Sequence, residues 1–303
     1  MSNRTLGHYR GKRWMAQAGR LYLGGALLGA GALSLAACSC GDTATGGSAG
    51  PASVAGGKTM GGQQPIKNAT VTLYAAGSGG YGQGSALTPT ATTDANGAWN
   101  ISFACPAAGT QIYVVVSGGD AGGGTNSAIA LSALLGHCGD SSNPLPTNAV
   151  IDEVTTVAAV YALNPFLSAD GTQPGTSSGN ATGLANAVGT LANLVDLPSG
   201  SAVSVSGGTL PSGASGTSPA SALNTLADIL AACVNSSGAS SSQCSTLFSN
   251  ALSGSTAPTT TLQAALNIAR NPGANVANLY ALSSTTSPFQ PILTAAPGDF
   301  TLA

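Results

Sequence analysis

Apolar and polar residues alternate along three segments in the first half of the chain. These segments are 69–74, 98–103 and 111–116, and they are rich in β-branched and aromatic residues. A period of two is typical of β-strands with one buried face. Residues 88–93 have a similar composition and are a further candidate strand. Short strands at this spacing predict a small antiparallel β-sandwich over about residues 53–118.

The tetrapeptide Asp94-Ala95-Asn96-Gly97 lies directly before the second of these strands. An Asp side chain accepts hydrogen bonds from nearby backbone amides, and Asn-Gly tolerates a positive φ. The tetrapeptide therefore predicts a hairpin turn. Its oxygens could also bind calcium, but the bidentate Glu that follows in an EF-hand is absent.

The second half of the chain carries a helical period instead. Apolar residues recur at spacings of three and four in four stripes: Val150, Val154, Val157 and Tyr161; Leu184, Val188, Leu191 and Val195; Leu223, Leu226, Ala227 and Leu230; and Leu262, Ala265, Leu266 and Ala269. Such stripes are faces of amphipathic helices. Thr147 and Asn148 are candidate caps for the first helix, and Ser218-Pro219 starts the third.

These stripes predict an Ala-rich helical bundle over about residues 125–282, followed by an irregular segment at 283–303. Together with the sandwich, the bundle makes the expected fold class α+β.

The first 37 residues are typical of an export signal. Five of the eight basic residues lie in the first twenty positions, and residues 21–36 carry no charge. Leu35-Ala36-Ala37-Cys38 then resembles the bacterial lipobox, in which the Cys is acylated and becomes the mature N-terminus. We therefore expect a cleaved lipoprotein signal at 1–37, a lipid on Cys38 and a flexible tether at 38–52.

Two alternatives to this anchor stay open. The chain could be secreted without a lipid, with Cys38 incidental. Cys40 is a weaker acylation candidate, because the residue three positions before it is Ala rather than Leu. With a lipid on Cys38, the chain is expected at the surface of a bacterial outer or cytoplasmic membrane.

The body of the chain has few charges. From Cys38 onward it holds 3 basic and 10 acidic residues, which gives a formal charge of about −7. A surface of this kind has little with which to bind phosphates, so no nucleic acid is expected as a partner. Gly77–Gly82 matches GxGxxG, but a loop and a candidate strand follow it rather than the helix that a nucleotide site needs.

Four cysteines remain for the body if Cys38 is acylated and Cys40 is left over. The natural pairs are Cys105–Cys138 and Cys233–Cys244. The chain-entropy model gives such cross-links about 3.8 and about 2.8 kcal/mol respectively. Metal binding is the alternative, but the chain has no CxxC, so neither a metal nor a cofactor is expected.

Residues 64–73, 92–99 and the strand around Tyr113 together resemble the carboxypeptidase regulatory-like (transthyretin-like) family. The similarity lies in a proline-led strand, a TD-x-NG-x-aromatic hairpin and a closing aromatic strand. It implies a non-catalytic β-sandwich that serves as a spacer, stabiliser or binding module on exported proteins. The Gly-rich insertion at 77–84 and the cysteine at 105 depart from the family pattern.

The order of sandwich, helices and the stretch at 287–293 is similar to the N-terminal region of exported bacterial proteins that continue into an NHL-type propeller. No propeller repeat occurs in this sequence. A natural short form and the N-terminal part of a larger propeller protein are both open.

The residues offer little for catalysis. His137 is the single histidine of the body and is expected at a loop or helix end beside a disulfide. Asp152 and Glu153 are adjacent on a predicted helix, so their side chains point about 100° apart and fit the helix N-terminus better than a glycosidase pair. We therefore expect no enzyme.

The sequence predicts a lipid-anchored structural and interaction protein, whose partner is the cell wall or another envelope protein. A glycan- or cell-wall-binding module that uses Tyr81 or Trp99 is the alternative. An enzyme with an unrecognised site is the third hypothesis.

Overall fold

A computed structural model describes residues 50–302 of the chain. The predicted signal peptide, Cys38 and Cys40 lie outside the described residues. The helices are α1 (Glu153–Leu163), α2 (Ala181–Leu191), α3 (Ala220–Val234), α4 (Ser242–Asn250), α5 (Thr261–Arg270) and α6 (Val276–Tyr280). The longer strands are β1 (Ala52–Gly61), β3 (Thr70–Ala75), β6 (Ala98–Ala104), β7 (Gln111–Ser117), β8 (Ala130–His137) and β9 (Ala149–Ile151). The short strands are β2 (Gln64–Pro65), β4 (Ser85–Ala86), β5 (Ala91–Thr92), β10 (Val195–Asp196), β11 (Ser201–Ala202), β12 (Gly208–Thr209) and β13 (Ser215–Gly216).

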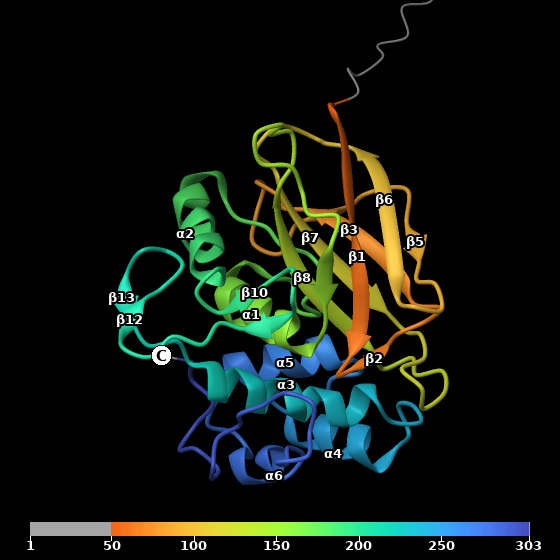
Figure 1. Ribbon diagram of the computed structural model, residues 1–303, viewed down its shortest axis with the longest axis vertical. Coiled ribbons are helices and arrows are strands. Elements are labelled where there is room, and N and C mark those ends of the chain that lie inside the picture. The colour runs from red at the N-terminus through yellow and green to blue at the C-terminus, as the bar shows by residue number, and fades with distance from the viewer. Residues whose placement is uncertain (1–49, 303) are drawn as a thin grey trace, which may run out of the picture. The chain divides into compact units, whose positions relative to one another are not determined.

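The β half of the protein consists of two sheets (Figure 1). In the first sheet, β1 pairs antiparallel with β6 and β2 and parallel with β9. In the second sheet, β3 pairs antiparallel with β7, β4 and β5, and β7 pairs with β8. One buried cluster holds apolar side chains from both sheets, including Ile101 and Phe103 of the first and Leu73 and Val114 of the second. The two sheets therefore pack face to face, and the α+β class is confirmed.

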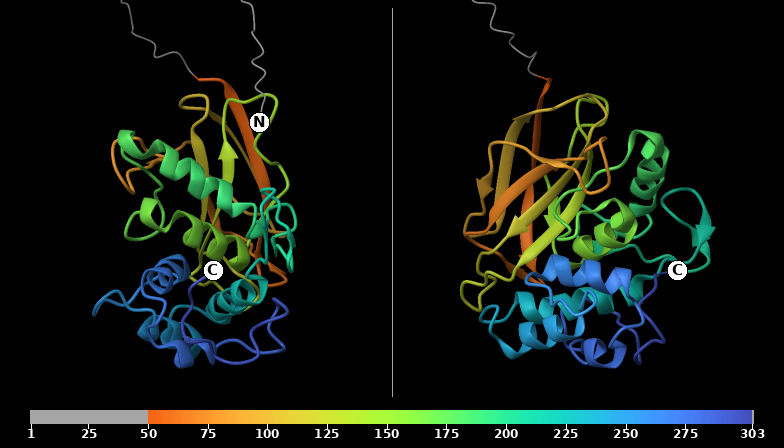
Figure 2. Two further views of the ribbon diagram at one scale, coloured as in Figure 1. Left: turned by 90° about the vertical axis from the view of Figure 1, so that its left-hand side faces the viewer. Right: turned by 180° about the vertical axis from the view of Figure 1, so that it is seen from behind.

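Strands β7 and β8 of the second sheet are buried on both faces. Along β7, Val114 and Val116 point to the first sheet, whereas Tyr113 and Val115 belong to a second cluster shared with the helices. Figure 2 shows α1 and α5 on the side of this sheet that faces away from β1 and β6. The Tyr113 hydroxyl donates a hydrogen bond to the Gly171 carbonyl at 3.1 Å.

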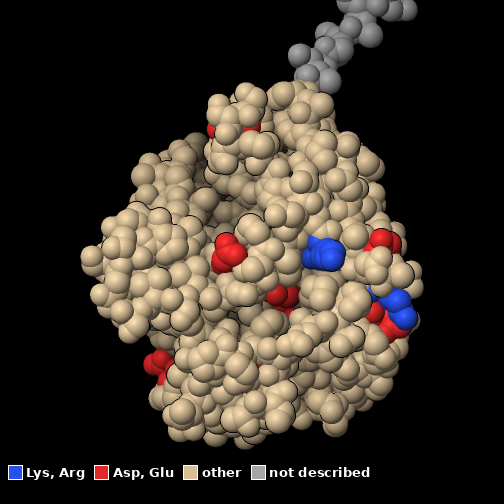
Figure 3. Space-filling model, in the orientation of Figure 1, with Lys and Arg blue, Asp and Glu red and all other residues tan. Residues whose placement is uncertain are grey.

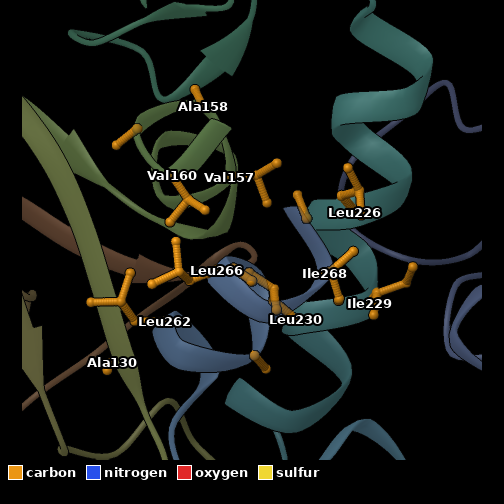
Figure 4. Packing of buried hydrophobic residues seen from close by; sticks show 14 of the residues in the cluster. Ala130, Val157, Ala158, Val160, Leu226, Ile229, Leu230, Leu262, Leu266 and Ile268 are labelled. Atoms are coloured by element: carbon orange, nitrogen blue, oxygen red, sulfur yellow. The ribbon is translucent and has the colours of Figure 1, made fainter. Parts of the chain in front are cut away.

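Apolar side chains of α1, α3 and α5 meet beside β8 (Figure 4). Val157 and Val160 come from α1, Leu226 and Leu230 from α3, and Leu266 from α5. Val157, Leu226, Leu230 and Leu266 belong to the stripes expected from the sequence, whereas Val160 does not, because α1 is buried on every side from Glu153 to Val160. The helical half is thus a layer on the second sheet rather than a separate bundle.

Threonine side chains cover the free edge of β8. The Thr261 hydroxyl accepts the Ala130 N–H at 3.0 Å and donates to the Ala130 carbonyl at 2.7 Å. The Thr156 hydroxyl accepts the Ser132 N–H at 2.9 Å. Because β8 ends the sheet, these bonds satisfy backbone groups that another chain could otherwise pair with.

The structure differs from the expected division between residues 118 and 125. Strands β8 and β9 lie after that boundary and complete the two sheets, and the described residues form one compact unit. His137, expected at a loop or helix end, is instead the last residue of a strand, because residues 130–137 form β8. Its side chains are apolar on both faces, and a run of this kind does not distinguish a buried strand from a helix.

Two helix starts also differ. Helix α1 begins at Glu153 with Asp152 as its cap, so Thr147 and Asn148 do not cap it, and Val150 lies in β9. Helix α3 begins at Ala220, one residue after the expected first position. Beyond Tyr280 the described chain has no helix or strand, as expected for the C-terminal segment.

Candidate functional site

Both expected disulfides are present. Cys105–Cys138 joins the residue after β6 to the residue after β8, with the Cα atoms 5.8 Å apart. Cys233–Cys244 joins α3 to α4, with the Cα atoms 4.4 Å apart. All four cysteines are buried. Counted along the chain, the first of them pairs with the second and the third with the fourth. The four cysteines of the described residues are therefore cross-links, not metal ligands.

The two aromatic residues expected to bind glycans differ in exposure. Trp99 is only 6% exposed and belongs to the cluster between the sheets. The expectation that it contacts glycans at the surface is therefore wrong. Tyr81 is 51% exposed, its ring lies 5.8 Å from that of Phe166, and its hydroxyl accepts a hydrogen bond from Asn180 at 2.8 Å. His137 is the last residue of β8, next to the Cys138 disulfide, and not at a helix end.

A cavity of about 580 Å³ lies where β1, the start of α1 and the C-terminal segment meet. We call it the Asp152 cavity. Its volume falls within the range of small-molecule sites in proteins. The residues that line it are Lys58, Met60, Gly62, Gln63, Pro65, Asn96, Val150, Asp152, Ser199, Gly200, Ser201, Pro288 and Phe289. Figure 3, viewed with β1 toward the reader, shows few charged side chains on this side of the molecule.

Asp152 reaches the cavity because it is the N-cap of α1. Its Oδ1 accepts the Thr155 N–H at 2.8 Å, and the Thr155 hydroxyl accepts the Asp152 N–H at 2.9 Å, which completes a capping box. Thr155 also donates to the Ser132 carbonyl at 3.2 Å, so the cap is tied to β8. Asp152 is held in place by a helix end and a sheet.

Two further carboxyl groups lie behind the walls of the cavity. Both carboxylate oxygens of Glu153 accept the Gly62 N–H, at 3.1 and 2.9 Å. Oδ1 of Asp228, on α3, accepts the Phe289 N–H at 3.0 Å, and its Oδ2 is buried without a partner. Gly62 and Phe289 both line the cavity. Each of these two wall segments is therefore held by a buried carboxyl group.

Burial raises the pKa of all three carboxyl groups. It raises the pKa of Asp152 to about 7, against the hydrogen bonds from Thr155 and Val154 that favour the charged form. It raises the pKa of Asp228 to about 7 as well. Burial, with the charge of Asp152 as a second cause, places the pKa of Glu153 well above its usual value. The only ion pair of the described residues joins Lys67 to Asp120, so no basic side chain offsets these groups directly.

The placement of Asp152 and Glu153 at a helix N-terminus agrees with the sequence analysis. Their burial, and their neighbours Asp228 and Phe289, were not expected. A signal was present in the sequence, since Asp228 is the single charge within the otherwise uncharged α3. The spacing of apolar residues along a helix, however, could not predict that Asp228 contacts Phe289, 61 positions later.

Among residues 50–302 no three Asp, Glu, His or Cys side chains gather as metal ligands. In the same residues no helix has the length and apolar character to cross a membrane. Comparison with family models, with curated proteins and with solved structures found no match to this chain.

Proposed function

We propose that the protein is a lipid-anchored component of the bacterial cell envelope that acts without catalysis as a structural and interaction module. The observation that carries the proposal is the pairing of all four cysteines of the described residues in two disulfides. Disulfides persist in exported proteins and are rare in the cytosol. An exported body agrees with the signal-like sequence of residues 1–37.

The anchor is a lipid on Cys38. Two or three acyl chains hold a protein firmly at a membrane, because each buried methylene contributes about 0.8 kcal/mol. Metabolic labelling with radioactive palmitate tests this in the membrane fraction. We expect the label on the native protein and none on Cys38→Ser, with Cys40→Ser as the matched control that keeps it. A native protein without label, or a label that survives Cys38→Ser, contradicts the anchor.

The sequence resemblance of residues 64–73 and 92–99 to the carboxypeptidase regulatory-like family supports the interaction role. The Asp94–Gly97 turn forms as that pattern requires, with Oδ1 of Asp94 accepting the N–H groups of Asn96 and Ala98, each at 2.8 Å. Gly97 has φ +72°, which favours glycine. We propose that the two sheets are such a sandwich and that the Asp152 cavity is the place where the module binds its partner.

The exposed Tyr81 favours glycan or cell-wall binding as a second candidate function. Its ring is supported by Phe166 and oriented by Asn180, which suits stacking against a sugar. A glycan array with native protein and Tyr81→Ala tests it. We expect retention on some glycan that Tyr81→Ala loses; no retention at all contradicts this second function.

A panel of hydrolase substrates tests the non-catalytic role, with His137→Ala as the control. We expect no turnover by the native protein. Turnover that His137→Ala abolishes would overturn the proposal.

A further inference from the structure

We propose that the Asp152 cavity binds a primary ammonium group on a short aliphatic chain, and that Oδ2 of Asp152 receives it. The proposal rests on the interaction role given above and names the class of ligand. It does not depend on the lipid anchor, because every residue that carries it lies in the described part of the chain.

The first observation is the position of the second carboxylate oxygen of Asp152, Oδ2. The side chain is only 3% exposed, yet it lines the cavity. The capping hydrogen bond from Thr155 uses Oδ1, and Oδ2 lies beside Gly200, which also lines the cavity. Oδ2 therefore offers an acceptor at the inner wall of the cavity.

The second observation is the glycine beside that oxygen. Gly200 lines the cavity with φ +68°, and a Cβ at this position would collide with Oδ2 of Asp152 and with Val150. The chain is held there by the hydrogen bond from the Gly200 N–H to the Asp196 carbonyl at 2.9 Å. The absence of a side chain at this residue keeps the approach to Oδ2 open.

The charges favour a cation at Oδ2. At pH 8 Asp228 on α3, whose pKa is about 7, adds negative potential from behind the wall, and Asp196 is the last residue of β10, four positions before Gly200. Lys58 on β1 is the only basic residue that lines the cavity. Lys58 is exposed, whereas Asp152 is buried, so the carboxyl group marks the inner end of the cavity and Lys58 its rim.

The lining also distinguishes an organic ammonium from a metal ion. A metal needs several oxygen, nitrogen or sulfur ligands at once, and residues 50–302 contain no such group of side chains. Met60, Pro65, Val150, Pro288 and Phe289 give the cavity apolar walls that suit methylene groups. A carboxylate at the other end of the chain would meet Lys58. The cavity thus offers a carboxylate, then apolar walls, then a basic side chain. An amino acid or short peptide with an amino group on an alkyl chain has the complementary sequence of groups.

Isothermal titration calorimetry of the full chain at pH 8 tests the site with three matched probes: 6-aminohexanoate, hexylamine and hexanoate. We expect the two ammonium probes to bind and hexanoate not to bind. Hexanoate binding as tightly as hexylamine, or no binding by either ammonium probe, overturns the proposal.

The decisive variant is Asp152→Asn, because Asn is an equally good N-cap and removes only the charge. We expect it to weaken hexylamine binding by about tenfold or more, the loss of one charge-assisted hydrogen bond. Asp299→Asn is the matched control: Asp299 is exposed, and its Oδ1 likewise accepts a backbone N–H, from Thr301. Equal affinity of Asp152→Asn and native protein contradicts the site.

Gly200→Ala tests the approach to Oδ2 separately. Gly207→Ala is its control, because Gly207 has φ +62° with no atom near its Cβ position, so it carries the backbone strain without filling a cavity. We expect Gly200→Ala to lose binding and Gly207→Ala to keep it. If Gly200→Ala does not fold, the Asp152→Asn comparison decides alone.

The two proposals can fail independently. Native protein that binds hexylamine but is not labelled by palmitate contradicts only the anchor. Labelled protein that does not bind hexylamine contradicts only the ammonium site.

Discussion

At the scale of single residues, the main feature is a group of carboxyl side chains that are buried without a basic partner. In the unfolded chain the pKa values of Asp and Glu are about 4, whereas those of Asp152 and Asp228 are about 7 in the folded protein. Between these values the folded protein binds more protons than the unfolded chain. The free energy of unfolding therefore falls as pH rises from about 4 to about 7, by up to about 1.4 kcal/mol per pH unit for each group.

Asp228→Asn should remove part of this dependence. The amide oxygen can still accept the Phe289 N–H, and no charge is buried at pH 8. We expect a smaller fall in the unfolding free energy between pH 5 and pH 8 than in the native protein, measured by urea denaturation at each pH. Asp299→Asn is the control, since the pKa of Asp299 is lowered and its titration lies below this window. An unchanged slope in Asp228→Asn would show that another group is responsible.

These residues also mark the limit of sequence reasoning about the site. Asp152 and Glu153 could be placed at a helix N-terminus because a local rule of charge governs that position. The contact of Asp228 with the backbone of Phe289 joins residues 61 positions apart, and it depends on how the C-terminal segment crosses α3. No period or motif encodes such a contact.

At the scale of elements, the edge of β8 depends on a helix that lies far away in the sequence. Thr261→Val keeps the size of the side chain but removes both hydrogen bonds to Ala130. We expect a loss of about 1–3 kcal/mol in unfolding free energy, because buried backbone groups lose a partner. Chemical denaturation measures it, and Thr209→Val, at an exposed residue of β12, is the control. A loss no larger than that of Thr209→Val would contradict this role of Thr261.

The disulfides can be ranked by the length of chain that they close. Cys105–Cys138 spans 33 positions and Cys233–Cys244 spans 11. The chain-entropy model therefore gives the first cross-link the larger effect, about 3.8 against about 2.8 kcal/mol. We expect the double Ala variant of the first pair to lose more unfolding free energy in denaturant titrations than that of the second. The reverse order would indicate that packing around α3 and α4 dominates.

Strands with one exposed face were predictable and doubly buried strands were not. β3 and β6 alternate along their length and agree with the segments inferred from period two. β8 is buried on one side by the first sheet and on the other by α1 and α5, so no polar alternation is left to identify it. β1 contains two adjacent glycines and few β-branched residues, and its strand conformation comes from its pairing with β6.

At the scale of the whole molecule, the shared second sheet makes the two expected domains one cooperative unit. We expect a single transition in calorimetry, with far-UV and near-UV circular dichroism changing together. A fragment of residues 50–118 should remain unfolded, because it lacks β8 and β9. Two resolved transitions, or a folded fragment, would restore the division between a sandwich and a bundle.

The order of the cysteine pairs has a consequence for biogenesis. Of the four cysteines in the described residues, the first bonds to the second and the third to the fourth, so the linkages neither interleave nor enclose one another. For a polypeptide that crosses a membrane from its N-terminus, as proposed here, oxidation in order of emergence yields these pairs if Cys40, which emerges before Cys105, is replaced by Ser. The Cys40→Ser variant should therefore mature without help from a disulfide isomerase, and deleting that enzyme from the host should leave the yield of this variant unchanged.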